Sequence, residues 1–136
     1  MTAMASAMAY GAGCPGTSGN VPSISATNAP HLGAPFNLRL DNARPTSPVA
    51  LYVGFAPGEL PIGGGCSLLW SLAAPSISLA SVSDGRGEAT VSVPIPDDLN
   101  LEGLQLYCQY VVIDPAGAYI NLAAFSSGVR AILGRP

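Results

Sequence analysis

The sequence contains no lysine and few charged residues of any kind. Charged residues make up 10% of its 136 residues, whereas an average soluble domain carries roughly 25%. We therefore expect a surface built largely from small neutral side chains. The basic side chains are five scattered arginines: Arg39, Arg44, Arg86, Arg130 and Arg135. Because nucleic-acid binding depends on clustered cations that neutralise phosphates, this scatter argues against a nucleic-acid partner.

The residues that usually perform chemistry are also scarce. His31 is the single histidine, so one chain cannot assemble a histidine-based zinc site, and no nucleophile-elbow signature supports a catalytic serine. The pattern G-x-G-x-x-G at 11–16 lacks the preceding strand and following helix that nucleotide binding requires. No segment approaches the ~20 apolar residues of a transmembrane helix. We expect no enzymatic activity, no cofactor and no membrane span.

The first nine residues, MTAMASAMA, differ in composition from the rest of the chain. They contain the small-x-small pattern of an export cleavage site, but they lack a positively charged start and a full apolar stretch. Two interpretations remain: residues 1–9 are the remnant of an export segment, or they form an ordered N-terminal arm. Residues 10–136 are expected to form a single domain, a length that fits one hydrophobic core.

Three cysteines allow one intrachain disulfide, with three pairings open from the sequence alone. Cys14 and Cys66 both lie in glycine-rich segments, whose conformational freedom suits disulfide geometry, and this favours their pairing. Cys108 alternates with apolar residues and is predicted to be a free, buried thiol.

Period-two alternation of apolar residues dominates the chain, and helical periodicity is nearly absent. The alternation and the turn residues between segments predict strands at 23–27, 36–40, 49–55, 66–72, 76–82, 89–93, 104–114, 119–125 and 128–133. Seven to nine short strands separated by Gly and Pro predict an all-β fold, an immunoglobulin-like antiparallel β-sandwich. Residues 105–113 are apolar on both faces, as expected of a central strand.

Loop carboxylates offer the one candidate metal site, a weak one for calcium. Its ligands would be Asp84, Asp97, Asp98 and Asn100, which carry the hard oxygen atoms that calcium prefers. No EF-hand spacing appears among them. Capping of local backbone amides in turns is therefore the favoured interpretation of these side chains.

Three aromatic residues are candidates for ligand binding. Tyr52 and Tyr107 occupy positions opposite the main apolar rows and are expected to be exposed, where a ring could support a sugar. Trp70 is the third candidate, although a single tryptophan more often packs in a core.

A set of motifs follows in order along residues 10–134. It comprises YGAGCPG (10–16), GAPFNLRL (33–40), ALYVGF (50–55), GCSLL (65–69), DGRGEATVSVPIP (84–96) and LQLYCQYVVIDPAG (104–117). This set resembles a β-sandwich module that recurs, often near the C-terminus, in exported proteins of some environmental bacteria. The resemblance implies export and a non-catalytic accessory or structural role.

Together these features predict a non-catalytic structural protein that acts outside the cell or on its surface and associates with copies of itself. One form of association is strand addition, with residues 1–9 or the C-terminal strand pairing with a neighbour's sheet. The alternative is an accessory module of an exported protein that binds a polysaccharide or another surface component.

Overall fold

The computed structural model describes residues 4–135, which fold into ten β-strands and two short 3-10 turns. The strands are β1 (Ser6–Tyr10), β2 (Ser23–Ala26), β3 (Pro35–Asp41), β4 (Pro48–Gly54), β5 (Pro57–Gly63), β6 (Cys66–Trp70), β7 (Ser76–Val82), β8 (Ala89–Pro94), β9 (Gln105–Ile113) and β10 (Ala123–Ile132). The turns are η1 (Thr17–Gly19) and η2 (Leu99–Leu101). The predicted all-β class is confirmed.

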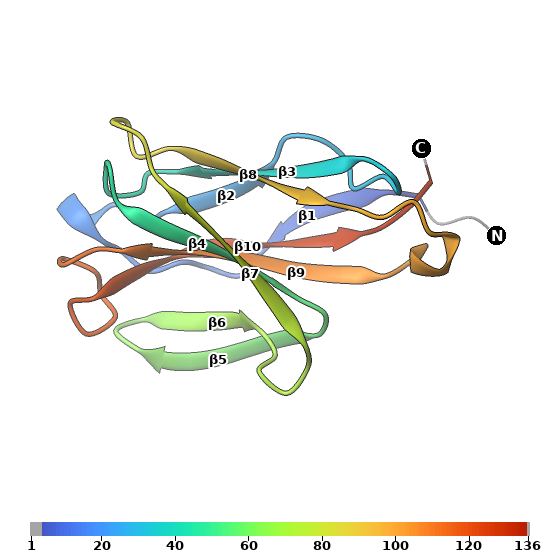
Figure 1. Ribbon diagram of the computed structural model, residues 1–136. Coiled ribbons are helices and arrows are strands. Elements are labelled where there is room, and N and C mark those ends of the chain that lie inside the picture. The colour runs from blue at the N-terminus through green and yellow to red at the C-terminus, as the bar shows by residue number, and fades with distance from the viewer. Residues whose placement is uncertain (1–3, 136) are drawn as a thin grey trace.

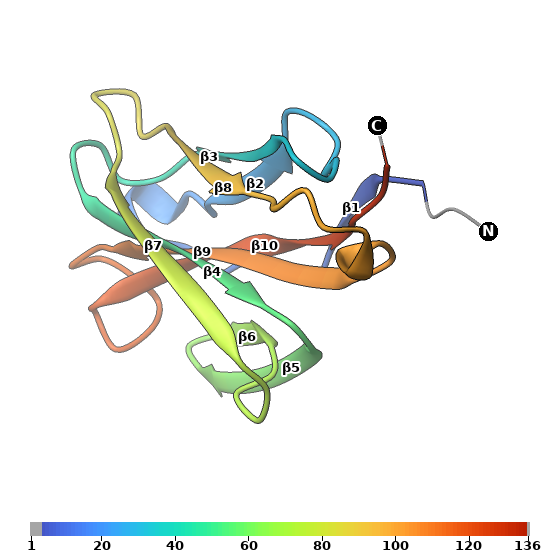
Figure 2. The same ribbon diagram turned by 45° about the vertical axis from the view of Figure 1, so that its right-hand side comes forward.

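The strands form three antiparallel sheets stacked in layers (Figures 1 and 2). A five-stranded sheet, in the order β1-β10-β9-β4-β7, packs against a three-stranded sheet, in the order β2-β3-β8. This pair forms an antiparallel β-sandwich. The β5–β6 hairpin is inserted between β4 and β7, and it lies on the outer face of the five-stranded sheet.

The core between the two larger sheets follows the alternation of the sequence. In β3, Phe36, Leu38 and Leu40 are fully buried, while the residues between them face outward. Tyr110 crosses this core from β9, and its hydroxyl donates a hydrogen bond of 2.6 Å to the carbonyl oxygen of Leu38. The two sheets are therefore joined by a polar contact as well as by apolar packing.

β9 occupies the centre of the five-stranded sheet, as its two-sided apolar character predicted. It lies between β10 and β4, with the small sheet on one face and the β5–β6 hairpin on the other. Its residues from Leu106 to Tyr110 are all buried. A strand covered on both faces has no need of an outward polar row.

The strand predictions were wrong in three places. Residues 119–125 and 128–133 do not form two strands: β10 runs from Ala123 to Ile132, which takes in the end of the first segment and most of the second, with a bulge between Phe125 and Gly128. β5, which begins at Pro57, was not among the predicted strands. β1 was not among the predicted strands, and it pairs with β10 of its own chain. The N-terminal arm is thus part of the domain from Ser6 onward, while residues 1–3 lie outside the described residues.

Helical structure in residues 4–135 is limited to the two short turns. None of it is long and apolar enough to cross a membrane.

Candidate functional site

Polar and aromatic side chains gather on the outer face of the five-stranded sheet. Strand register places directly opposite residues on one face, so two rows can be followed across the strands. The first row runs from Met8 through Arg130 to Tyr107, and the second from Tyr10 through Gly128 to Gln109 and Tyr52. The β5–β6 hairpin covers the second row and leaves part of the first row open.

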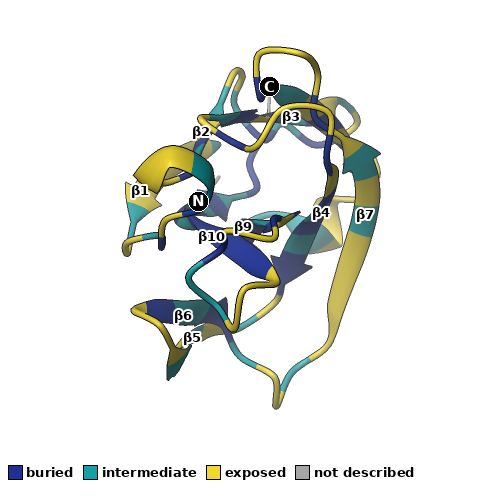
Figure 3. Cartoon of the chain, turned by 90° about the vertical axis from the view of Figure 1, so that its left-hand side faces the viewer, coloured by how far each residue is buried: buried dark blue, intermediate teal, exposed yellow. Residues whose placement is uncertain are grey.

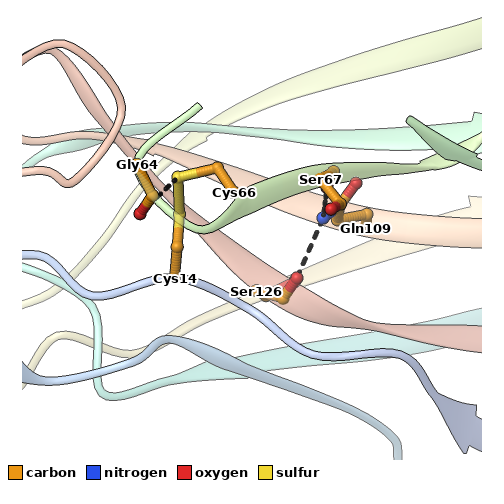
Figure 4. The surroundings of a disulfide bond; sticks show 6 residues. All are labelled: Cys14, Gly64, Cys66, Ser67, Gln109 and Ser126. Carbon is orange, nitrogen blue, oxygen red and sulfur yellow. Dashed lines mark hydrogen bonds between the residues drawn. A yellow bond between two sulfur atoms is a disulfide. The ribbon is translucent and has the colours of Figure 1, made fainter. Parts of the chain in front are cut away.

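Gln109 fastens the hairpin to the sheet. Its side-chain Oε1 accepts a hydrogen bond of 3.1 Å from the backbone N–H of Leu69 in β6. Its Nε2 donates to the carbonyl oxygens of Ser67 and Ser126, at 3.0 Å each (Figure 4). Ser126 lies in the β10 bulge. In a regular ladder the carbonyl group of such a residue would bond to the neighbouring strand, whereas in the bulge it accepts from Gln109. The fully buried amide of Gln109 is thereby satisfied.

The Cys14–Cys66 disulfide holds the other end of the hairpin (Figure 4). Both cysteines are buried, with their Cα atoms 5.0 Å apart, and the predicted pairing is confirmed. The turn before Cys66 requires glycine, because Gly64 has a positive φ of 66° and a Cβ there would lie 1.9 Å from the carbonyl oxygen of Ala118. The disulfide and the glycine turn together fix the position of the β5–β6 hairpin on the five-stranded sheet.

Cys108 is free and fully buried on the inner face of β9, as predicted. Burial raises the pKa of its thiol to about 12. Because the thiolate is the reactive form, this cysteine is expected to be inert in the folded protein.

Tyr10 closes the end of the second row. A Cβ on Gly128 would lie 2.5 Å from the Tyr10 ring, so this ring lies directly over Gly128. Its hydroxyl donates a hydrogen bond to the carbonyl oxygen of Leu69. Burial, followed by the nearby Cys108 and Tyr107, raises the pKa of Tyr10 well above its ordinary value. The ring also meets Tyr107 edge to face, with centroids 6.1 Å apart.

The three predicted binding aromatics do not form an exposed platform. Tyr107 is only 7% exposed, so the expectation that it is exposed was wrong: β5 and Tyr10 lie beside it around a shared hollow. Trp70 is 6% exposed and stacks on Tyr52, with ring centroids 5.1 Å apart and planes inclined by 13°. Tyr52 is half-buried under this contact. The aromatic residues therefore serve mainly to pack the hairpin onto the sheet.

A hollow of about 470 Å³ remains where the first row emerges beside the hairpin. It is lined by Met8, Tyr10, Pro57, Gly58, Glu59, Tyr107 and Arg130. The Nε of Arg130 is buried and has no hydrogen-bond partner among residues 4–135. Within the same residues, no carboxylate lies within ion-pair distance of Arg130. Arg130 and Glu59 thus line the same hollow without forming an ion pair with each other.

Of the residues that line this hollow, Tyr107 alone was predicted from the sequence as a binding residue. Arg130 is one of five scattered arginines, and only strand register brings it beside Met8 and Tyr107. Gln109 did leave a signal, since it is the one polar side chain inside the apolar run 106–113. A buried polar side chain in such a run needs a partner from another element.

The four calcium candidates do not converge. Asp84 precedes β8, whereas Asp97, Asp98 and Asn100 follow it, so a strand of six residues separates them. Asp84 accepts hydrogen bonds from the backbone N–H groups of Arg86 and Glu88, and Asp98 accepts one from Asn100. Asp84 and Asp98 therefore cap turns, as the favoured interpretation predicted. No group of three or more His, Cys, Asp or Glu side chains within the described chain is placed to hold a metal ion.

Asp114 is a buried carboxylate that joins two loops. It accepts hydrogen bonds from the backbone N–H and hydroxyl of Thr17, at 2.7 and 2.8 Å, and from the backbone N–H of Ala116 at 2.8 Å. Burial opposes its ionisation, but these donors outweigh burial, and the pKa of Asp114 lies below its ordinary value. Gly16 leaves room for the carboxylate, because a Cβ there would lie 2.3 Å from Oδ2.

His31, the single histidine, lies in the loop before β3. Its Nδ1 lies 3.3 Å from the backbone carbonyl oxygen of Arg135. This contact links the loop before β3 to the C-terminal segment, where Leu32 N–H also donates to Gly134 at 2.9 Å. The side chain of His31 therefore contacts the backbone of the C-terminal segment.

The five-stranded sheet ends in two open edges, β1 and β7. Four of the five β1 residues are exposed, and β7 is exposed along most of its length (Figure 3). Neither SAMAY in β1 nor SISLASV in β7 contains a charged residue or a proline. The chain matches no protein-family model, no curated protein and no solved structure.

Proposed function

We propose that this protein is a non-catalytic structural protein that associates with copies of itself outside the cell, by joining the β1 edge of one copy to the β7 edge of the next. The observation that carries this proposal is the pair of exposed, uncharged edges on one sheet. An edge strand presents unpaired backbone N–H and C=O groups, which form a ready template for another strand.

Natural proteins usually protect such edges with lysine, inward-facing charges, proline or a bulge. The seven residues of β7 contain no lysine, no other charged residue and no proline. The ladder between β7 and β4 is regular from Ser76 to Val82, so it has no bulge either. Its side chains add an apolar component, because Ile77 is 45% exposed and Val82 is 60% exposed. Pairing with another copy would remove part of this apolar surface from water.

The two edges differ, so their contact is head to tail. A contact between two different surfaces leaves one free edge at each end of the assembly, and it generates filaments unless the rotation between copies closes a ring. This form of the proposal uses the outer edge of β1, since its inner edge already pairs with β10.

Two further features support the proposal. The Cys14–Cys66 disulfide favours an oxidising compartment and therefore a site of action outside the cell. The low charge of the chain weakens the repulsion between copies and therefore favours their association.

Lysine substitution on each edge tests the proposal. Ser6→Lys in β1 and Ala80→Lys in β7 place a charge on an exposed edge position, and each is expected to reduce the mass of the assemblies measured by light scattering at micromolar concentration. Ser92→Lys on β8, an edge of the small sheet, is the control and should leave the mass unchanged. A monomeric wild-type protein over the whole concentration range would refute the proposal.

Mixing the two variants identifies the edges that meet. The Ser6→Lys variant keeps an intact β7, and the Ala80→Lys variant keeps an intact β1. An equimolar mixture is therefore expected to form heterodimers that grow no further, while each variant alone stays monomeric. Dimers of the Ser6→Lys variant alone would show a symmetric contact between two β7 strands instead and would overturn the head-to-tail arrangement.

The alternative prediction, an accessory module that binds a polysaccharide through exposed aromatic rings, is weakened, because two of the three predicted aromatics, Tyr107 and Trp70, are buried. The hollow beside Arg130 offers such a module a recess that contains charged groups and one of the three predicted aromatics, Tyr107.

A further inference from the structure

We infer that the hollow beside Arg130 is a binding site for a neutral sugar residue. This inference does not rest on self-association, since the hollow lies on the sheet face and the proposed contacts use the sheet edges. Its volume of about 470 Å³ falls within the ~300–1,000 Å³ of small-molecule pockets.

Arg130 has an unsatisfied donor beside the hollow. Its Nε–H is shielded from water and has no acceptor in the described chain. A buried donor without a partner costs about 1–3 kcal/mol, and most such groups in native proteins have a partner. A ligand oxygen that draws the guanidinium toward the hollow would supply the missing acceptor.

The hollow contains both hydrogen-bond donors and an acceptor. Arg130 presents a fork of N–H donors and no acceptor, whereas the carboxylate of Glu59 only accepts. Vicinal hydroxyl groups of a sugar both accept and donate, so they can satisfy both side chains at once. The two side chains carry opposite charges and leave the hollow without a net charge, which disfavours a purely anionic or purely cationic ligand.

Part of the lining of the hollow is apolar. The rings of Tyr10 and Tyr107 line the hollow together with Pro57 and Met8. Both tyrosine hydroxyls already donate hydrogen bonds, to Leu69 and Gln105. Their rings therefore contribute apolar area, which suits the C–H face of a pyranose.

The test is a titration of the isotope-labelled full chain followed by NMR. The probes are the methyl glycosides of glucose, galactose and mannose, with sodium acetate and glycine as charged comparisons. At least one glycoside is expected to shift the Arg130 Nε–H signal and the backbone amides of Met8 and Glu59 in a saturable way at millimolar concentration. The inference is overturned if no glycoside gives a saturable shift, or if acetate or glycine gives one and the glycosides do not.

Two variants locate the site. Arg130→Lys keeps the charge but loses the planar fork, and Glu59→Gln keeps the size but loses the carboxylate. Each is expected to weaken binding at least about tenfold, which corresponds to ~1.4 kcal/mol. Arg86→Lys, on an exposed turn, is the matched control and should bind like the wild type. Unchanged affinity in both site variants, with Trp70 fluorescence showing them folded, would place the ligand elsewhere and refute the inference.

Discussion

The side-chain Oε1 of Gln109 accepts a hydrogen bond from the backbone N–H of Leu69, 40 residues earlier in the chain, at 3.1 Å in a fully buried setting. Through this contact, the central strand of the domain holds a hairpin that belongs to neither of the two larger sheets. Burying an amide is favourable only when its polar atoms are paired, so the hairpin and the amide depend on each other.

Replacing Gln109 by leucine should therefore destabilise the domain. The change leaves the N–H of Leu69 and the carbonyl oxygens of Ser67 and Ser126 without this partner, at about 1 kcal/mol each, or about 3 kcal/mol in total. Urea unfolding followed by Trp70 fluorescence measures the loss. Gln105→Leu, at an exposed position of the same strand, should cost less than about 1 kcal/mol. Equal effects of the two substitutions would contradict the fastening role of Gln109.

Removing the disulfide should destabilise the protein by more than the loss of two cysteine side chains. In the chain-entropy model, a crosslink with a sequence separation of 52 contributes about 4 kcal/mol. The free energy of unfolding of the Cys14→Ala/Cys66→Ala variant measures this contribution. Cys108→Ala supplies the matched control, since it truncates a buried cysteine without breaking a crosslink. Similar losses in the two variants would show that the crosslink itself adds little.

The Cys108 thiol should not react in the folded protein. Burial and a pKa raised to about 12 keep it protonated and covered at neutral pH. Titration with Ellman's reagent is expected to find no reactive thiol under native conditions, one per chain in guanidinium chloride, and three after reduction. Rapid native reaction would mean that β9 opens to solvent.

The Asp114 carboxylate should make stability depend on acid pH. Its folded-state pKa lies below its unfolded-state pKa of about 3.9, so its contribution is complete above that pH and declines as the pH falls through the folded-state pKa. Asp114→Asn removes this contribution and is expected to cost about 2 kcal/mol at pH 7, because three hydrogen bonds lose their charged acceptor.

The measurement is the free energy of unfolding of both proteins from pH 7 down to pH 2. The gap between the wild type and Asp114→Asn should narrow below about pH 4. Asp97→Asn, on an exposed loop, should change stability at pH 7 by less than about 0.5 kcal/mol. A gap that stays constant to pH 2 would show that the Asp114 charge does not contribute to stability.

The errors in strand prediction have a common cause. Period-two alternation identifies a strand that is covered on one face, as in Phe36, Leu38 and Leu40. β1 and β5 are mostly exposed on both faces, so their sequences show no such alternation. The bulge in β10 also escaped prediction, because the gap between two apolar segments looks like a turn unless the partner strand is known.

The sequence by itself determined the all-β class, the inward rows of the core and the central place of residues 105–113, because burial on one or two faces leaves a local pattern in the order of residues. It also favoured the Cys14–Cys66 pairing through the flexible segments on either side. Only the tertiary structure decided that the β5–β6 hairpin covers the sheet, that Tyr107 and Trp70 are buried, and that Arg130 meets Glu59 in one hollow. These relationships join residues far apart in the chain, and no local pattern records them because they depend on strand register and on which face of a sheet receives another layer.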